Sequence, residues 1–210
     1  NNTTTSDDFT ISWFRQYRNL SFRTDLLELS VSAEFNILGF EPGNMRKMIS
    51  PFISAGVGII YFDPKAPYNS DWVSRQTDNA QSPVSNAADY KYDKWVRLQP
   101  IGTEGQGLPG NPQKYKLIQP GYVLGIGVKC NLSPSVTLSW QVNHHFTFTD
   151  YLDDVSTVYP DRKDFYKYYD YEKAQMAANL SVRSKEFDPG GQYSYITDKG
   201  QQRGNPKFND

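Results

Sequence analysis

The sequence predicts an all-β protein, and more closely a small antiparallel transmembrane β-barrel, which needs about eight strands to close. Two observations lead to this prediction. Apolar and polar residues alternate in long runs between Leu27 and Phe148, and a period of two residues is the period of a strand. The runs are connected in turn by short turns and by long polar loops. Outer-membrane barrels have this asymmetry, with short turns at one end and long loops at the other.

The first predicted strand covers residues 22–38. One face carries Glu28 and Glu34, and the other is apolar, with Leu27, Leu29, Val31, Ala33, Phe35 and Ile37. About eleven residues of a strand tilted by about 45° rise about 25 Å, which is the height of the apolar band of an outer-membrane barrel. The run is therefore long enough to cross a membrane.

Three further strands are predicted, over residues 52–62, 121–132 and 136–148. Residues 39–50 contain Pro, Gly and Asn and are predicted to form the turn between the first two strands. Residues 133–134 turn the third strand tightly into the fourth. The two turns belong to the same end of the sheet. Each antiparallel strand reverses the direction of the chain, so the connections alternate between the two ends, and a long loop separates the two turns.

The segments 63–118 and 149–210 are predicted to be long surface loops at the opposite end, because they are polar and irregular. A short helix is predicted only around residues 171–182. Three of its side chains would pack on the rim of the barrel: Met176, Ala177 and Leu180.

Residues 1–210 are expected to form one domain with one core, since 38% hydrophobic and 15% aromatic content suffices and no second core is marked. Only four strands are evident, so we expect the barrel to lack strands at both ends of this chain. The chain begins at Asn1 without a basic or an apolar leader segment. A secretory signal is therefore expected either to have been removed or never to have been present.

Composition disfavours several other classes of protein. The mean hydropathy is −0.66 and no long apolar run exists, whereas a helical membrane protein needs runs of about 18 apolar residues. The net charge of −1, with scattered Lys and Arg, predicts no nucleic-acid partner. The single cysteine, Cys130, is predicted to be a packing residue. No phosphate-binding loop, Cys/His cluster or serine elbow is present, so we expect no enzyme, no cofactor and no metal.

The less apolar face of the predicted strands carries glycines at positions 56, 58, 121, 125 and 127. They leave room in a narrow interior that Phe52 or Glu28 would fill. We expect the polar side chains on this face to pair, because buried charges normally do: Glu28, Glu34, Lys129, Gln141 and Asn143. An ion path through this interior is the alternative.

Three other groups of residues carry competing interpretations. His144 and His145 are adjacent in a strand and point to opposite faces, so they do not share a metal, and His145 is expected to form hydrogen bonds. The acidic side chains of Asp150, Asp153 and Asp154 suit a calcium ion. A helical turn over residues 151–155, capped by Thr149 and Asp150, is the preferred interpretation. The tyrosine-rich segment 159–171 suits packing at the rim of a barrel better than contact with a partner.

Four strings of residues together resemble one family. They are Arg18-Asn19-Leu20-Ser21-Phe22-Arg23, Thr103-Glu104-Gly105-Gln106-Gly107, Phe148-Thr149-Asp150-Tyr151-Leu152-Asp153-Asp154-Val155-Ser156 and Arg203-Gly204-Asn205. Over residues 18–205 the chain is similar to the PorG family of Bacteroidetes. Members of that family are small porin-like outer-membrane barrels associated with the type IX secretion system, which exports proteins and powers gliding.

The resemblance implies a non-enzymatic component in the outer membrane of a Gram-negative bacterium, in contact with its lipid. Its partners would be a periplasmic ring lipoprotein and the companion protein of that lipoprotein, which it tethers. A periplasmic ring would meet the short-turn end, where Arg46, Lys47 and Met48 are the predicted contacts. An independent small porin or channel is the first alternative, and a soluble lipocalin-like carrier is the second.

Overall fold

The computed structural model describes residues 17–69, 94–184 and 198–204. The chain divides into two compact units. The sheet unit consists of Leu26–Phe62 and Lys116–Thr149. The loop unit consists of the other described residues, which come from the segments before, between and after those two stretches. Each unit has an architecture of its own.

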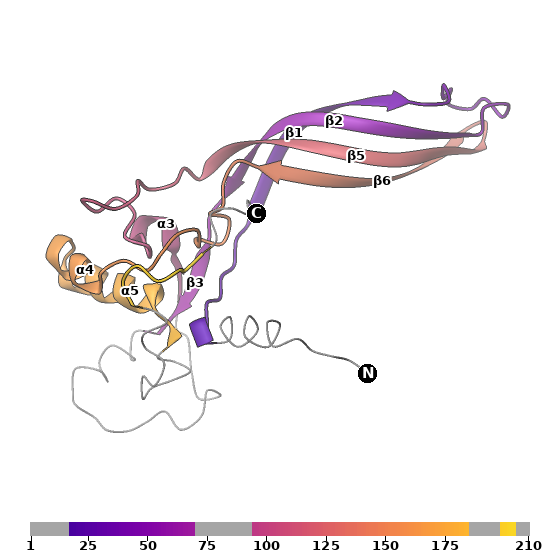
Figure 1. The fold of residues 1–210 in the computed structure, drawn as a ribbon. Helices are drawn as coiled ribbons and strands as arrows, with labels where there is room; N and C mark the ends of the chain where they lie inside the picture. Colours follow the sequence, from indigo (N-terminus) through magenta and orange to yellow (C-terminus); the bar gives the residue numbers. More distant parts are fainter. Residues whose placement is uncertain (1–16, 70–93, 185–197, 205–210) are drawn as a thin grey trace, which may run out of the picture. The chain divides into compact units, whose positions relative to one another are not determined.

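The sheet unit is one antiparallel sheet of four strands (Figure 1). Their order is β1 (Leu26–Asn36), β2 (Ile49–Phe62), β5 (Ile118–Ser133) and β6 (Val136–Thr147). All four predicted strands are confirmed, with ends that differ by a few residues. The first strand begins at Leu26 rather than at residue 22, because Arg23 pairs instead with Lys65 of the loop unit through two backbone hydrogen bonds of 2.8 Å.

The strand register keeps apolar and polar residues in separate rows. One row crosses the four strands at Val31, Val57, Tyr122 and Phe146. The next row contains Ser32, Gly56, Val123 and His145. A slip of one residue between any two strands would mix the rows. The alternation in the sequence therefore excludes slips by an odd number of residues, whereas the exact register depends on the turns and on contacts between strands.

On the two central strands, β2 and β5, the two faces of the sheet differ in exposure, whereas almost all residues of β1 and β6 are exposed on both faces. On the apolar face Val31 is 77% exposed and Val57 is 69% exposed. On the other face Phe52 is 1% exposed, and Ser50, Ser54 and Asn131 are also buried. A single sheet buries one of its faces without a second layer when it curves around that face. The polar face is therefore the concave one.

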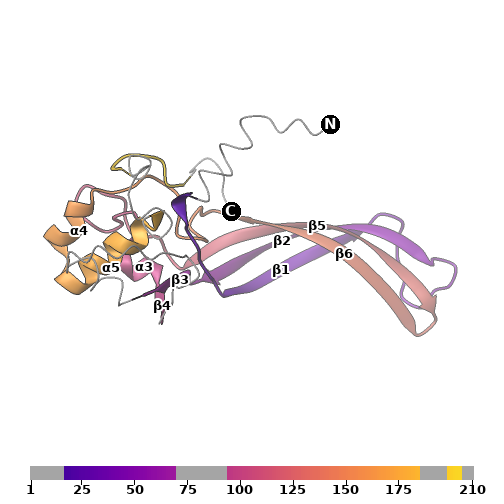
Figure 2. The same cartoon turned by 90° about the horizontal axis from the view of Figure 1, so that it is seen from below.

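A contact between the two outermost strands supports this curvature, and Figure 2 shows the bend of the strands. Nδ1 of His145 on β6 lies 2.8 Å from Oε2 of Glu28 on β1. His145 lies in the same row as Ser32, four residues from Glu28. In a flat sheet, three strand spacings of about 4.8 Å and four residues of about 3.3 Å would separate the Cα atoms by about 20 Å. The two side chains, with bonds of about 1.5 Å, and the 2.8 Å contact reach about 13 Å at most. The sheet must therefore curve to bring them together.

The concave face is filled by its own side chains. A Cβ atom on Gly127 would lie 2.5 Å from Cζ of Phe52 and 2.5 Å from the carbonyl oxygen of Trp140, so the ring of Phe52 occupies the space that this glycine leaves. The predicted pairing of polar groups on this face is confirmed. Lys129 pairs with Glu34, and the side-chain amide of Gln141 donates to Ser54 Oγ at 2.8 Å and to Asn143 Oδ1 at 2.6 Å.

The loop unit contains regular structure in segments that were predicted to be irregular. Strands β3 (Lys65–Tyr68) and β4 (Lys94–Arg97) pair antiparallel, and the short helix α3 (Leu98–Ile101) follows directly. Helix α4 (Arg162–Tyr168) was not predicted, because Phe165 is its one buried residue and no apolar periodicity marks it. Helix α5 (Tyr171–Ser181) confirms the predicted helix. No helix in the described part of the chain is long and apolar enough to cross a membrane.

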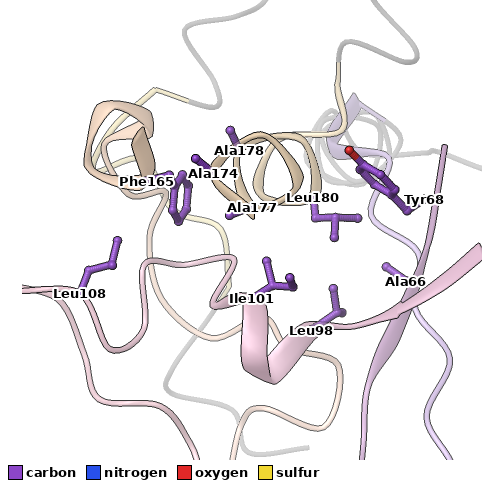
Figure 3. Close-up of a cluster of buried hydrophobic side chains, with 10 residues drawn as sticks. All are labelled: Ala66, Tyr68, Leu98, Ile101, Leu108, Phe165, Ala174, Ala177, Ala178 and Leu180. Carbon is purple, nitrogen blue, oxygen red and sulfur yellow. The ribbon is translucent and has the colours of Figure 1, made fainter. Parts of the chain in front are cut away.

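The loop unit has a hydrophobic core, formed by segments that were predicted to be surface loops. Figure 3 shows Leu180 of α5 facing Leu98 and Ile101 of α3, and Ala174 of the same helix beside Phe165. Phe165, Leu108, Ala66 and Tyr68 complete this cluster with Ala178. Of the three helix residues predicted to lie on a barrel rim, Ala177 and Leu180 belong to this core and Met176 packs against it.

Candidate functional site

A buried cluster of charged side chains lies in the loop unit, with Arg203 at its centre. Arg203 is 2% exposed. Its Nη1 donates to Glu104 Oε1 at 3.1 Å and to the carbonyl oxygen of Asp154 at 2.8 Å. Its Nε donates to the carbonyl oxygen of Ser181 at 3.3 Å. One guanidinium therefore joins three segments that are far apart in the sequence.

The carboxyl group of Glu104 accepts hydrogen bonds from several donors. Besides Arg203, the backbone N–H of Ser156 donates to its Oε1 at 3.0 Å. Thr157 donates to its Oε2 through the backbone N–H at 3.0 Å and through Oγ1 at 2.7 Å. Hydrogen bonds to an ionised group are stronger than those between neutral groups. Burial alone would lower the pKa of Arg203, but Glu104 and Asp154 outweigh this and raise it.

Asp154 is the second carboxyl group of the cluster and accepts two hydroxyl hydrogen bonds. Thr103 Oγ1 donates to its Oδ2 at 2.5 Å, and the hydroxyl of Tyr115 donates to its Oδ1 at 2.7 Å. Burial raises the pKa of Asp154 to about 6, against the opposing effect of Arg203. The cluster contains one cation and two carboxyl groups, and Glu104 receives the direct ion pair. Asp154 is therefore the group that gains a proton when the pH falls.

Tyr115 extends the cluster. Burial and the neighbouring Asp154 raise the pKa of its hydroxyl, which keeps the phenol protonated and able to donate. The ring of Tyr115 stacks on that of Tyr151 with centroids 4.7 Å apart. Neither the position of Tyr115 nor its role was predicted from the sequence, because a tyrosine in a polar loop carries no signal of burial.

The four strings that carry the family resemblance meet at this cluster. From the first string, Nη1 of Arg18 donates to the carbonyl oxygen of Arg203, and Ser21 Oγ accepts from Arg183 at 2.6 Å. The second string supplies Thr103 and Glu104, the third supplies Asp154 and Ser156, and the fourth supplies Arg203. The resemblance thus rests on residues that the fold brings together.

The remaining residues of these strings serve the backbone around the cluster. Gly105 and Gly107 have φ values of +78° and +84°, which an L side chain rarely adopts. Gln106 is buried and accepts from the backbone N–H of Glu104 at 2.9 Å. A Cβ on Gly204 would lie 2.5 Å from the backbone of Ser156. Asn205 lies outside the described residues.

The acidic segment 150–154 does not form the predicted helical turn. Residues 151–154 form a β-turn in which the backbone N–H of Asp154 donates to the carbonyl oxygen of Tyr151 at 3.1 Å. Asp154 has a φ of +67°, which ends any helical path. Asp153 Oδ1 instead accepts from the N–H of Val155 at 2.9 Å. Leu152 is half-buried in the same turn.

The calcium hypothesis for Asp150, Asp153 and Asp154 finds no support in the geometry. Among the described residues, no group of three or more Asp, Glu, His or Cys side chains is placed to hold a metal ion. Asp154 points at hydroxyl donors and Asp153 at a backbone N–H. Burial raises the pKa of Asp150. The three carboxyl groups serve separate local contacts.

The predicted partner contacts lie in the connection between β1 and β2. Arg46, Lys47 and Met48 are all exposed, and Lys47 Nζ lies 3.8 Å from Glu41.

The side chains of the tyrosine-rich segment 159–171 differ in exposure. Tyr159 is buried, whereas Tyr166, Tyr168 and Tyr171 are exposed. That segment belongs to the loop unit.

Comparisons with known proteins find no matching family model, no matching curated protein and no matching solved structure. The class of the molecule therefore follows from its own geometry. It combines a curved antiparallel sheet that is apolar on its convex face with a separately packed unit built around a buried ion pair.

Proposed function

We propose that this chain is a non-enzymatic component of the type IX secretion system in the outer membrane of a Gram-negative bacterium of the Bacteroidetes. Its curved sheet would be part of a small transmembrane β-barrel, and its role would be to attach the periplasmic ring complex to the membrane. The observation that carries the membrane part of the proposal is the inverted sheet, with an apolar convex face and a polar concave face.

A barrel in a bilayer needs an apolar outer face and a polar inner face, which is the arrangement of this sheet. Outward-facing residues of such a barrel contact lipid, whereas inward-facing residues are polar. Val31 and Val57 are exposed on the convex face, while Gln141, Lys129 and their partners pair on the concave face. Strand β1, with 11 residues, has the length that about 25 Å of apolar thickness requires at a tilt of about 45°.

Aromatic side chains gather near one end of the convex face. Tyr122 stacks on Phe146 with centroids 4.5 Å apart, and Phe148 lies 5.9 Å from Tyr122. Aromatic residues are enriched where a membrane-spanning barrel meets the lipid headgroups. This group supports the assignment of that end of the strands to a membrane interface.

The proposal requires further strands beside β1 and β6. Among the described residues, both strands have a neighbour on one side only. In hydrocarbon each unpaired backbone group costs several kcal/mol, so spanning sheets are closed. We therefore propose that additional strands close the sheet into a barrel of about eight strands.

The link to secretion rests on the family resemblance. Its support in the structure is the meeting of the four strings around Arg203, because a resemblance spread over one physical cluster is more specific than four isolated strings. The channel alternative is disfavoured by the ring of Phe52 over Gly127, since this fills the concave face. The soluble carrier is disfavoured because its apolar residues would line the concave face.

The proposal is tested by expressing the full-length protein with an affinity tag in its native host. After fractionation of the envelope and purification in detergent, the co-purifying proteins are identified by mass spectrometry. We expect the protein in the outer-membrane fraction together with the ring lipoprotein and its companion. Recovery from the soluble fraction would reject the membrane assignment. A partnerless membrane protein with measurable conductance in a planar bilayer would favour the channel.

A further inference from the structure

The connection between β1 and β2, residues 37–48, is an ordered structure that the side chain of Asn131 holds through hydrogen bonds. The side chain of Asn131 is fully buried. Its Nδ2 donates to the carbonyl oxygens of Glu41 at 2.9 Å, Asn44 at 3.3 Å and Lys47 at 3.3 Å. Its Oδ1 accepts from Thr137 Oγ1 at 2.7 Å. One amide on β5 therefore fixes three positions of this connection.

Further contacts within the connection restrict it. Gly43 has a φ of +77°, and a Cβ there would lie 2.5 Å from the carbonyl oxygen of Pro134 in the β5–β6 turn. The backbone N–H of Lys47 donates to the carbonyl oxygen of Asn44 at 3.0 Å. The N–H of Arg46 donates to Asn44 Oδ1 at 2.9 Å. A surface that is ordered before binding loses less conformational entropy when a partner binds.

Large apolar side chains of this ordered connection are exposed. Leu38, Met45 and Met48 are 64%, 40% and 45% exposed. The backbone N–H of Asn131 donates to the carbonyl oxygen of Met48 at 2.7 Å, so the two residues are neighbours in the ladder. Met48 therefore lies in the same row of the sheet as residues of the concave face. It does not extend the convex apolar face, to which the next residue, Ile49, belongs. Contact with lipid along that face does not account for its exposure.

The charge of the connection adds a second requirement for any partner. It contains two cations, Arg46 and Lys47, and one carboxylate, Glu41. Lys47 lies 3.8 Å from Glu41, whereas Arg46 makes no ion pair among the described residues. Arg46 is exposed beside Met45. The surface that complements this arrangement has an apolar pocket with a carboxylate at its edge.

We propose that Leu38, Met45 and Met48, together with Arg46, form a docking surface for a protein that offers an apolar pocket bordered by carboxylates. The inference rests on the proposed function, in which this protein belongs to the periplasmic ring. Flexible methionine side chains adapt to apolar pockets and supply the main contact area. Arg46 sets the orientation and speeds association. Asn131 is a positioning residue, because it holds the connection without contacting the partner.

The test uses the full-length tagged protein in its native host, with quantitative recovery of the ring lipoprotein and its companion as the readout. The variant Met45→Asp/Met48→Asp is expected to reduce recovery of both by about tenfold or more, as the loss of central apolar anchors does. Arg46→Glu is expected to reduce it several-fold. The matched control, Tyr166→Asp/Tyr171→Asp, places two carboxylates on exposed residues of the loop unit and is expected to leave recovery unchanged.

A second measurement keeps folding and binding apart. The amount of each variant in the outer membrane, and its shift in mobility on heating in detergent, report assembly of the sheet. A photo-crosslinking residue in place of Met45 is expected to join the protein to a ring component. Introducing Asn131→Ala is expected to weaken that crosslink even in molecules that reach the membrane.

The possible outcomes separate the two proposals. If the wild-type protein recovers no ring component, the proposed function fails. If the wild-type protein and Met45→Asp/Met48→Asp recover the ring components equally, the proposed function survives and the docking surface is wrong. Crosslinking of position 45 to lipid alone would also overturn the docking surface, because the connection would then lie in the headgroup region.

Discussion

The sheet unit and the loop unit place their apolar side chains in opposite positions. In the sheet unit, Val31 and Val57 point outward and are largely exposed. In the loop unit, Phe165 and Ala177 are completely buried. Both arrangements obey the same rule if the two units face different solvents, because apolar groups are driven out of water but not out of hydrocarbon. The proposed membrane location accounts for both arrangements.

The two units also treat charge differently. The sheet unit distributes its charges over the concave face as separate pairs, Lys129 with Glu34 and His145 with Glu28. The loop unit concentrates charge at one buried point around Arg203. Loss of one member of a separate pair leaves one charge without its partner, whereas loss of Arg203 leaves two buried carboxyl groups without their cation. Removal of a charge should therefore have its largest effect in the loop unit.

The largest effect is expected from Arg203→Met. This change leaves Glu104 buried without its cation, and breaking a buried ion pair costs about 3–5 kcal/mol. The loss of stability is measured by unfolding the purified full-length protein in urea, with proteolytic cleavage within the loop unit as the readout. The control Lys199→Met removes a cation from the same segment, but one in an exposed pair with Asp161. It is expected to have no measurable effect. Equal effects of the two changes would mean that the cluster is not a stabilising feature.

A somewhat smaller effect is expected from Val57→Arg on the convex face. A cation at the middle of a bilayer destabilises a barrel by about 2–4 kcal/mol. The control is Tyr171→Arg, a change at a similarly exposed position, since these residues are 69% and 61% exposed. Unfolding in lipid vesicles should show a loss for Val57→Arg and almost none for Tyr171→Arg. If neither change matters, the convex face contacts water and the comparison between the units fails.

The pH dependence of the loop unit should come next in size. The pKa of Asp154 in the folded chain, about 6, lies above its ordinary value of 3.8. The folded state therefore binds the proton more tightly, and its stability falls as the pH rises from about 4 to about 6. A shift of about two units corresponds to about 3 kcal/mol at most. The difference in unfolding free energy between wild type and Asp154→Asn should change over this range and be constant above it. A difference that is constant throughout would contradict the raised pKa.

The smallest effect is expected at the start of helix α5. Asp170 Oδ1 accepts from the backbone N–H of Lys173 at 3.0 Å, and loss of such a cap costs about 1 kcal/mol. Asp170→Ala should therefore lower the stability of the loop unit, whose core includes this helix, and leave the sheet unit unchanged. Glu172→Ala, which removes a carboxylate from the same turn without removing the cap, is the control. A loss in both units would indicate that they unfold together.

The four strands were predictable from the sequence because each carries its own evidence. Alternation with a period of two also determined which residues share a face, and hence that Lys129 and Glu34 belong to one group of polar side chains. The pairing partner of Glu28 was less apparent, since His145 lies on the outermost strand at the other edge of the sheet. That contact depends on curvature, which alternation does not encode.

The candidate site was predictable only in part. The strings around Thr103, Asp154 and Arg203 were recognised by resemblance, but nothing in the sequence indicated that they meet. Helix α4 lacks apolar periodicity, and Tyr115 looks like any loop tyrosine. Long-range pairing of charged groups has no local pattern, because it depends on how the intervening chain folds.

The sequence by itself determined the strands, the apolar and polar faces of the sheet, and the helix that begins at Tyr171. These features depend on the order of neighbouring residues, which local periodicity records. The tertiary structure alone decided that His145 meets Glu28, that the long loops have a core, and that Arg203 is buried between Glu104 and Asp154. Those features depend on contacts between segments distant in the chain, and such contacts form only when the free energy of packing outweighs the entropy of closing the loops between them.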